Sequence, residues 1–161
     1  NQLSLAKYLI IAAAEDNPNL DIHDVKGFFT HILERIDLTR DLHFQTNTTI
    51  DTLDYTGDGL NAGSKVVFAA AGSKKRELAI ELPAGFEIPR PFNKAKLVLP
   101  GIIAIEGANF TSYDNEERVL EARTNAAKDI NFEGIQLIVL VDNADFTAAN
   151  DNNFVWETFT K

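Results

Sequence analysis

The chain has 161 residues, of which 45% are hydrophobic, 24% charged and 9% aromatic. This composition is that of a folded globular protein with a sizeable core, and it excludes a disordered chain, collagen and a coiled coil. The 15 basic and 24 acidic residues give a formal net charge of −9, which disfavours nucleic acid as the principal partner. The sequence has no cysteine, which excludes disulfides, thiolate nucleophiles and Cys-based metal sites.

The first apolar run, at residues 8–14, is followed by the acidic pair Glu15-Asp16. It is much shorter than the roughly 20 residues that a membrane span needs. A signal-peptide core is an alternative, but only Lys7 supplies positive charge before it, so we interpret the run as a buried strand. On this interpretation the protein is expected to be cytoplasmic. Since the sequence has no methionine, even at position 1, we expect it to be a fragment.

A helix and two strands are predicted next in the first half. Asp21 is expected to cap the helix, with Asp24 in its first turn. The helix has one apolar stripe at helical spacing. Its members are Val25, Phe28, Phe29, Ile32 and Ile36. Strands are predicted at residues 42–46 and 66–71, separated by a long polar loop at residues 47–64.

The second half has the same kinds of element. Strands are predicted at residues 95–99, 102–105 and 135–141, and helices at residues 112–128 and 154–159. The last helix reaches the end of the chain without a cap, so it looks cut short. Strands alternating with amphipathic helices predict an α/β fold, a three-layer sandwich with a mixed sheet, in which two strand-turn-helix units resemble one another. We expect one domain over residues 1–161, with halves at 1–76 and 77–161, the second truncated.

Possible metal ligands were weighed against structural roles. Residues 54–65 begin like an EF-hand loop, but Lys65 stands where that loop needs a bidentate glutamate. The three histidines, His23, His31 and His43, are interpreted as surface or helix-flank residues. We therefore predict no metal-binding residue.

Polar and charged clusters flank the predicted strands. Asp142, Asp145, Asn150 and Asp151 follow the strand at 135–141, and we interpret them as turn and cap residues. The basic cluster at residues 74–76 is interpreted as solvated surface. Because Asp16 and Asp142 each follow a strand, a stand-alone small-ligand-binding or receiver-like α/β domain remains an alternative.

Three segments of the first half, read in order, resemble the carboxy-terminal domain of the UbiD family, decarboxylases of the 3-polyprenyl-4-hydroxybenzoate type. Residues 35–41, Arg-Ile-Asp-Leu-Thr-Arg-Asp, match a family pattern that has Pro where this chain has Leu38. Residues 50–54, Ile-Asp-Thr-Leu-Asp, and residues 63–65, Gly-Ser-Lys, match two further patterns. Residues 69–71 are Ala-Ala-Ala where the family often has Asp-Ala-Thr, so this chain departs from the pattern there.

The end of the chain resembles the opening of the same domain. Residues 141–145, 152–156 and 160–161 are similar to its Val-Asp-Asp-Asp, Asn-Asp-Val-Ile-Trp and Thr-Arg segments. The resemblance covers residues 7–71 and 135–161.

The resemblance implies that the parent protein is a non-oxidative decarboxylase of an aromatic or unsaturated acid, as in ubiquinone biosynthesis. It also implies prenylated FMN with a divalent metal and a monovalent cation, all held by preceding amino-terminal and flavin-binding domains. The family's Glu-Arg-Glu acid–base set belongs there too, and Glu-Glu-Arg at residues 116–118 does not fit it. We therefore assign no catalytic, cofactor-binding or metal residue to this chain and expect an assembly domain.

The resemblance further implies a homodimer. The last predicted helix carries four large apolar side chains within six residues, which we expect to be partly exposed and available for association. These are Phe154, Val155, Trp156 and Phe159.

Overall fold

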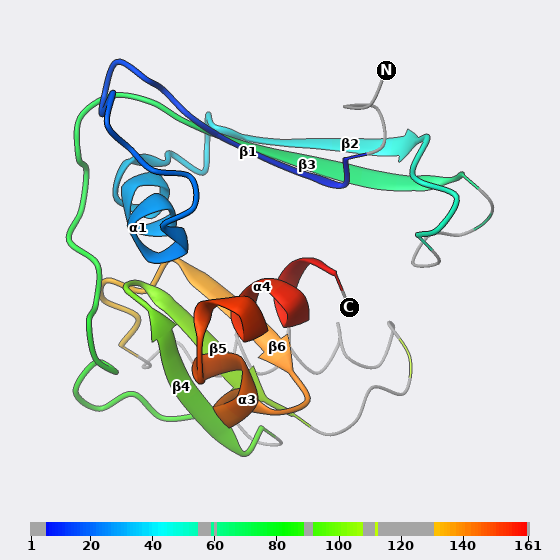
Figure 1. The fold of residues 1–161 in the computed structure, drawn as a ribbon. Coiled ribbons are helices and arrows are strands. Elements are labelled where there is room, and N and C mark those ends of the chain that lie inside the picture. The colour runs from blue at the N-terminus through cyan, green and yellow to red at the C-terminus, as the bar shows by residue number, and fades with distance from the viewer. Residues whose placement is uncertain are drawn as a thin grey trace. The chain divides into compact units, whose positions relative to one another are not determined.

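The computed structural model consists of two compact units, Asn1–Arg76 and Glu77–Lys161. It describes residues 6–54, 59, 61–88, 92–107, 112 and 131–160. Each unit contains a three-stranded mixed sheet (Figure 1). The predicted α/β class is confirmed, with two small mixed sheets in place of one. Among the described residues, no helix is long and apolar enough to cross a membrane.

The first unit has three strands and one helix. In chain order they are β1 (Tyr8–Ala12), α1 (Val25–Arg35), β2 (Leu42–Thr48) and β3 (Gly63–Ala70). The sheet order is β1-β3-β2, with β1 parallel and β2 antiparallel to the central β3. The three predicted strands are confirmed, but the first is not buried as expected, since Tyr8 and Ile11 of β1 are 38% and 44% exposed. β2 and β3 extend into the predicted loop because Thr48 pairs with Gly63, beyond an irregularity in the register.

Helix α1 begins later than the sequence predicts. Its N-cap is Asp24, whose Oδ1 accepts a hydrogen bond from the Gly27 N–H at 2.9 Å. Asp21 was the expected cap, and this prediction is wrong: its Oδ1 accepts the His23 N–H at 2.8 Å in the preceding turn. An aspartate makes both kinds of local bond equally well, so residue type alone does not separate the two positions.

The basic cluster at residues 74–76 caps the other end of α1. Lys74 and Lys75 are exposed, as predicted, whereas Arg76 is half-buried. Nη1 of Arg76 donates to the carbonyl oxygens of Leu33 and Ile36, both at 2.7 Å. Nζ of Lys75 donates to Asp37 at 3.0 Å. Cations are favourable at a helix C-terminus, where carbonyl groups lack helical partners.

The UbiD-like segment at residues 35–41 forms the turn between α1 and β2. The buried carboxylate of Asp41 accepts the Asp37 N–H at 2.9 Å and pairs with the Arg40 guanidinium. This guanidinium holds the pKa of Asp41 below its usual value. Asp37 accepts both the N–H and the hydroxyl of Thr39. The acidic residues of the segment therefore stabilise a turn.

The second unit has three strands and two described helices. They are β4 (Lys94–Leu99), β5 (Ile102–Glu106), β6 (Leu137–Val141), α3 (Ala144–Ala148) and α4 (Asp151–Phe159). The order is β4-β5-β6, with β4 antiparallel and β6 parallel to β5. The three predicted strands are confirmed, whereas the helix predicted at residues 112–128 lies outside the described residues apart from Ser112.

The polar stretch after β6 supplies helix caps, as predicted. Asn150 Oδ1 accepts the Asn153 N–H at 2.9 Å and caps α4, while Asp145 and Asp151 lie in first turns. Helix α3 itself was not predicted. The expectation of an uncapped last helix is wrong, because the N–H and hydroxyl of Thr160 both donate to the Trp156 carbonyl oxygen.

The two units share one arrangement with a different chain order. In each, a strand that leads into a helix lies parallel to the central strand, and an antiparallel hairpin completes the sheet. In the first unit the strand and helix, β1 and α1, precede the hairpin β2-β3. In the second unit β6 and α3 follow the hairpin β4-β5. The predicted likeness of the two strand-turn-helix units is therefore present in the fold.

Candidate functional site

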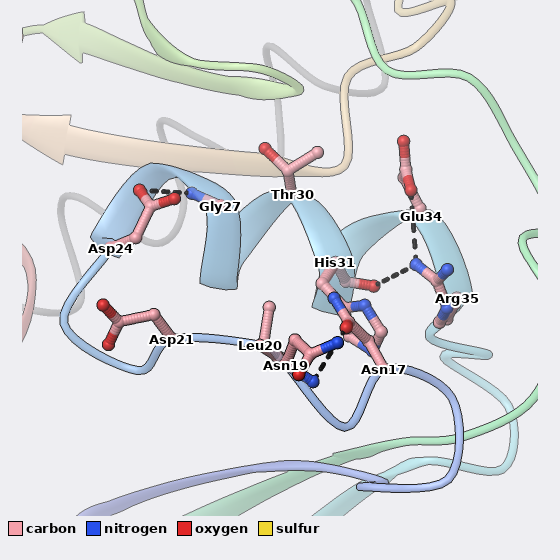
Figure 2. Close-up of a pocket in the computed structure, with 10 residues that line it drawn as sticks. All are labelled: Asn17, Asn19, Leu20, Asp21, Asp24, Gly27, Thr30, His31, Glu34 and Arg35. Atoms are coloured by element: carbon pink, nitrogen blue, oxygen red, sulfur yellow. Dashed lines mark hydrogen bonds and ion pairs between the residues drawn. The ribbon is translucent and has the colours of Figure 1, made fainter.

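The first unit contains a pocket between α1 and the loop that leads into it from β1 (Figure 2). Its volume is about 390 Å³. One wall is a face of α1 from Asp24 to Arg35, and the other is formed by residues of the loop at 17–21. The pocket thus lies on the carboxyl side of a parallel strand, where α/β folds commonly place binding sites.

His31 is the most unusual residue of the wall. Its side chain is buried, with 5% of the residue exposed, and its Nε2 has no hydrogen-bond partner among the residues that the structure describes. Nε of Arg35, in the next turn, is also buried without a partner there. His31 is therefore not a surface residue, although it does lie on a flank of α1, the other alternative that the sequence left open. The loop covers this flank of α1, and helical spacing does not reveal that cover.

The surroundings of His31 disfavour its protonated form. Burial lowers the pKa of the imidazole, and the Arg35 guanidinium lowers it further, while the Asp16 and Glu34 carboxylates act in the opposite direction. Nη1 of Arg35 donates to the His31 carbonyl oxygen at 3.1 Å and to Glu34 Oε2 at 3.2 Å. At neutral pH the ring is therefore uncharged.

This lowered pKa predicts that the first unit loses stability in acid. Above the ordinary pKa of 6.5 the imidazole is neutral in both the folded and the unfolded chain. As the pH falls below that value, the unfolded chain binds a proton that the folded chain does not, so the free energy of unfolding decreases until the lower, folded-state pKa is passed. Urea unfolding followed by circular dichroism between pH 7.5 and 5 measures this slope.

The matched variant for this prediction is His31→Gln, which keeps a polar side chain but removes the titration. Its free energy of unfolding should decline less steeply below pH 6.5 than that of the unchanged chain. Equal slopes in the unchanged chain and in His31→Gln would contradict the assignment of the acid sensitivity to His31.

The other candidate ligands do not converge. His23 and His43 are exposed, as predicted. Within the described ranges, no group of three His, Cys, Asp or Glu side chains is placed to hold a metal ion. Most of the EF-hand-like loop at 54–65 lies outside those ranges. The described residues thus offer no ligand set for the metal that the family resemblance implies.

Carboxylates join neighbouring strand ends in both units. Asp16 Oδ2 accepts the Gly72 N–H at 2.6 Å and so connects the segments that follow β1 and β3. Glu106 Oε2, at the end of β5, accepts the Ala144 N–H at the start of α3, at 3.0 Å. The position of Asp16 after a strand was one reason to consider a receiver-like domain. In the structure, one oxygen of its carboxylate is occupied by the bond from Gly72, so this carboxylate has a structural role.

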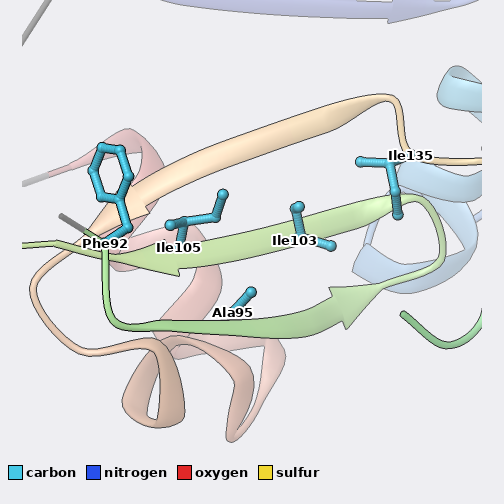
Figure 3. Close-up of a cluster of buried hydrophobic side chains, with 5 residues drawn as sticks. All are labelled: Phe92, Ala95, Ile103, Ile105 and Ile135. Atoms are coloured by element: carbon cyan, nitrogen blue, oxygen red, sulfur yellow. The ribbon is translucent and has the colours of Figure 1, made fainter. Parts of the chain in front are cut away.

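One face of the second sheet is filled by apolar side chains. Five of them form a buried cluster on the same side of β4 and β5 (Figure 3). They are Phe92, Ala95, Ile103, Ile105 and Ile135. On the opposite side, Lys94 and Lys96 of β4 pair with Asp145 of α3. Both features stabilise the unit.

The expected apolar stripe of the last helix is only partly exposed. Phe154 is completely buried, at 0% exposure, and Val155 and Phe159 are half-buried. Trp156 is 58% exposed, and Phe146 of α3 is 45% exposed. A stripe that is partly buried and partly exposed is what the sequence predicts, and α4 also packs against α3, which was not predicted. Trp156 is the member of the stripe that remains available to a partner.

Comparison with known proteins adds to this description. Residues 1–70 match the model of the 3-octaprenyl-4-hydroxybenzoate carboxy-lyase C-terminal domain. The chain is 32% identical over 160 residues to an uncharacterized protein of Chlamydia caviae, and 32% identical over 168 residues to a Chlamydia pneumoniae protein named as a subunit of 4-hydroxybenzoate decarboxylase. Each alignment covers 99% of this chain and 25% of the relative, so the chain spans about a quarter of their length. No solved structure matches.

Proposed function

We propose that the chain is the carboxy-terminal assembly domain of a UbiD-like decarboxylase, because residues 1–70 match the model of the 3-octaprenyl-4-hydroxybenzoate carboxy-lyase C-terminal domain. The family match is the observation that carries this proposal. The name of the Chlamydia pneumoniae relative supports the same reaction class. In this proposal all 161 residues form one carboxy-terminal-like domain with two halves.

The proposed reaction of the parent protein is the non-oxidative decarboxylation of an aromatic or unsaturated carboxylic acid. Prenylated FMN with its metal and monovalent cation, bound in other domains, supplies the electron sink for the developing carbanion. These 161 residues contribute the turn at 35–41, the two sheets and a contact surface, and no acid or base of the reaction. The engaged carboxylates of Asp16, Asp41 and Glu106 are in keeping with this division of roles.

The test compares the full-length parent protein with this chain alone. The parent, carrying prenylated FMN, should release CO2 from 4-hydroxybenzoate or from an α,β-unsaturated acid such as cinnamic acid. The isolated chain should release none under the same conditions. CO2 release by the isolated chain would contradict the non-catalytic role, and a loaded parent that decarboxylates no aromatic or unsaturated acid would contradict the reaction class.

The assembly role includes a symmetric homodimer that covers Trp156. The side chain is large, apolar and exposed, and tryptophan is frequent among residues that dominate binding energies. A stable dimer should bury at least about 1,000 Å² in total. The net charge of −9 opposes association, but physiological salt screens it over about 8 Å.

Sedimentation equilibrium at several protein concentrations tests the dimer. The chain should dimerise at tens of micromolar or below, and Trp156→Ala should raise the dissociation constant at least about tenfold. Phe44→Ala is the matched control, because it removes another exposed aromatic side chain, on β2 of the other unit. A monomer at these concentrations, or equal weakening by both variants, would contradict the proposal.

A further inference from the structure

The edge strands of the two sheets differ in how they are protected against pairing with another chain. An open strand edge is a template for such pairing, and proteins commonly protect it with charged side chains or irregular register. β4 carries Lys94 and Lys96 and has an irregular register near its end. β2 is polar at residues 45–48 and irregular there. β6 has neither protection, because its residues 137–141 are all apolar and pair in continuous register with β5.

Two large apolar side chains of β6 are exposed on one face of the sheet. Ile138 is 40% exposed and Leu140 is 39% exposed. They pair in register with Ile103 and Ile105 of the buried cluster (Figure 3), so all four side chains lie on the same face. As far as the structure describes the sheet, β6 is its outer strand, and the exposed pair forms a strip along this edge. The two exposed side chains of β1 form no such strip, because they are three positions apart and point to opposite faces.

The main-chain groups of β6 that face away from β5 belong to Ile138 and Leu140. The Leu137 N–H donates to the Gly101 carbonyl oxygen at 3.1 Å, on the side of β5. On that side too, the Val141 carbonyl oxygen accepts an N–H at 3.3 Å from the residue that follows β5. The N–H and C=O groups of a strand residue point to one side, and this side alternates along the strand. Those of Ile138 and Leu140 therefore point toward the open edge of the described sheet.

We propose that β6 pairs antiparallel with β6 of a second copy of this chain, in register about Val139, and joins the two three-stranded sheets into one. In this register Ile138 lies opposite the partner's Leu140, so the exposed side chains cover one another. The outward N–H and C=O groups of each such pair bond to one another across the interface. This inference rests on the proposed homodimer and names the surface that forms it.

The strand is self-complementary, which favours a second copy over a different partner. Its sequence, Leu-Ile-Val-Leu-Val, sets an apolar residue opposite an apolar residue at every position when it is reversed about the central valine. A two-fold axis through this valine, perpendicular to the sheet, generates a closed dimer. It leaves α3, and α4 packed against it, on the same side of the joined sheet in both copies. The strand pair and the exposed Trp156 of α4 together contribute to the roughly 1,000 Å² that a stable dimer buries.

The first test uses the absence of cysteine from this chain. Val139→Cys introduces one thiol at the proposed two-fold axis. Residues that face each other there without hydrogen bonds have Cα atoms about 4.5 Å apart, within the range that a disulfide spans. Mild oxidation should therefore produce a covalent dimer, measured on non-reducing gels at several times.

Ile80→Cys is the matched control for random collision. Ile80 is 79% exposed and Val139 only 9%, so collisions alone would link the cysteine at position 80 faster. In a dimer paired through β6, Val139→Cys should instead be linked at least about tenfold faster than Ile80→Cys, because the two thiols are held together. Equal rates, or a faster reaction of Ile80→Cys, would overturn the proposal.

The second test needs no cross-link. Leu140→Lys places a charge on the edge strand and should raise the dissociation constant at least about tenfold in sedimentation equilibrium. Ile80→Lys adds the same charge to an exposed position of the same unit and should leave the constant unchanged. A dimer that Trp156→Ala weakens but Leu140→Lys does not would contradict the strand pairing and keep the homodimer. A chain that stays monomeric would contradict both.

Discussion

Replacing Phe154 by alanine should lower the free energy of unfolding of the second unit by about 3–5 kcal/mol. Phe154 is completely buried and makes an edge-to-face contact with Phe159, with ring centroids 5.9 Å apart. Alanine would remove the buried ring and leave a cavity between α4 and its surroundings, which relax only in part. Urea unfolding followed by far-ultraviolet circular dichroism measures the change.

Trp156→Ala is the matched variant, two residues further along the same helix. Its side chain is mostly exposed, so the free energy of unfolding of the monomer should change by less than about 1 kcal/mol. The two variants thus separate the inner face of α4 from the face that we propose for dimer contacts. Similar losses of stability in both would show that the burial of Phe154 is not what stabilises the helix.

Gly134→Ala should destabilise the second unit by about 3 kcal/mol or more. Gly134 has a φ of +73°, and an added Cβ would lie 2.5 Å from the backbone nitrogen of Ala79. The Gly134 carbonyl oxygen accepts the Ala79 N–H at 3.0 Å, so the two segments cannot separate without losing this bond. The substitution therefore combines backbone strain with a clash against main-chain atoms just before β6.

Gly85→Ala isolates the strain from the clash. Gly85 has a φ of +77°, but an added Cβ there would meet no atom within 4 Å. Its cost should be about 1–2 kcal/mol, the cost of the left-handed conformation alone. Thermal unfolding of the two variants at equal protein concentration gives the comparison. Equal losses would contradict the close approach of Gly134 to Ala79.

The strands and the main apolar stripe were predictable from sequence because their signals are local. β1 and β6 are continuous apolar runs and β5 is one up to Glu106, and such runs predict strands. Only β5 is buried along most of its length, because both β1 and β6 carry exposed apolar side chains. Pro100-Gly101 marks the turn between β4 and β5, where Gly101 has a φ of +74°. In α1, Phe29, Ile32 and Ile36 of the predicted stripe are buried.

Features that depend on contacts distant in sequence were missed. Helix α3 has only five residues and follows polar ones, so its periodicity is too short to recognise. β2 is mostly exposed, so no alternation of apolar residues marks its extension to Thr48. The contacts of Arg76 with the carbonyl groups of α1 span about 40 positions of the chain, and nothing in its neighbours indicates them.

The sequence by itself determined the α/β class, the places of six strands and the resemblance of residues 1–70 to a known domain family, because apolar runs and ordered motifs are properties of neighbouring residues. The tertiary structure alone decided which polar residues have a special environment. His31 is buried because a loop crosses one flank of α1, and the packing of α4 decides that Phe154 is buried while Trp156 is exposed. Burial and unpartnered polar atoms arise from packing between segments, and local spacing carries no information about that packing.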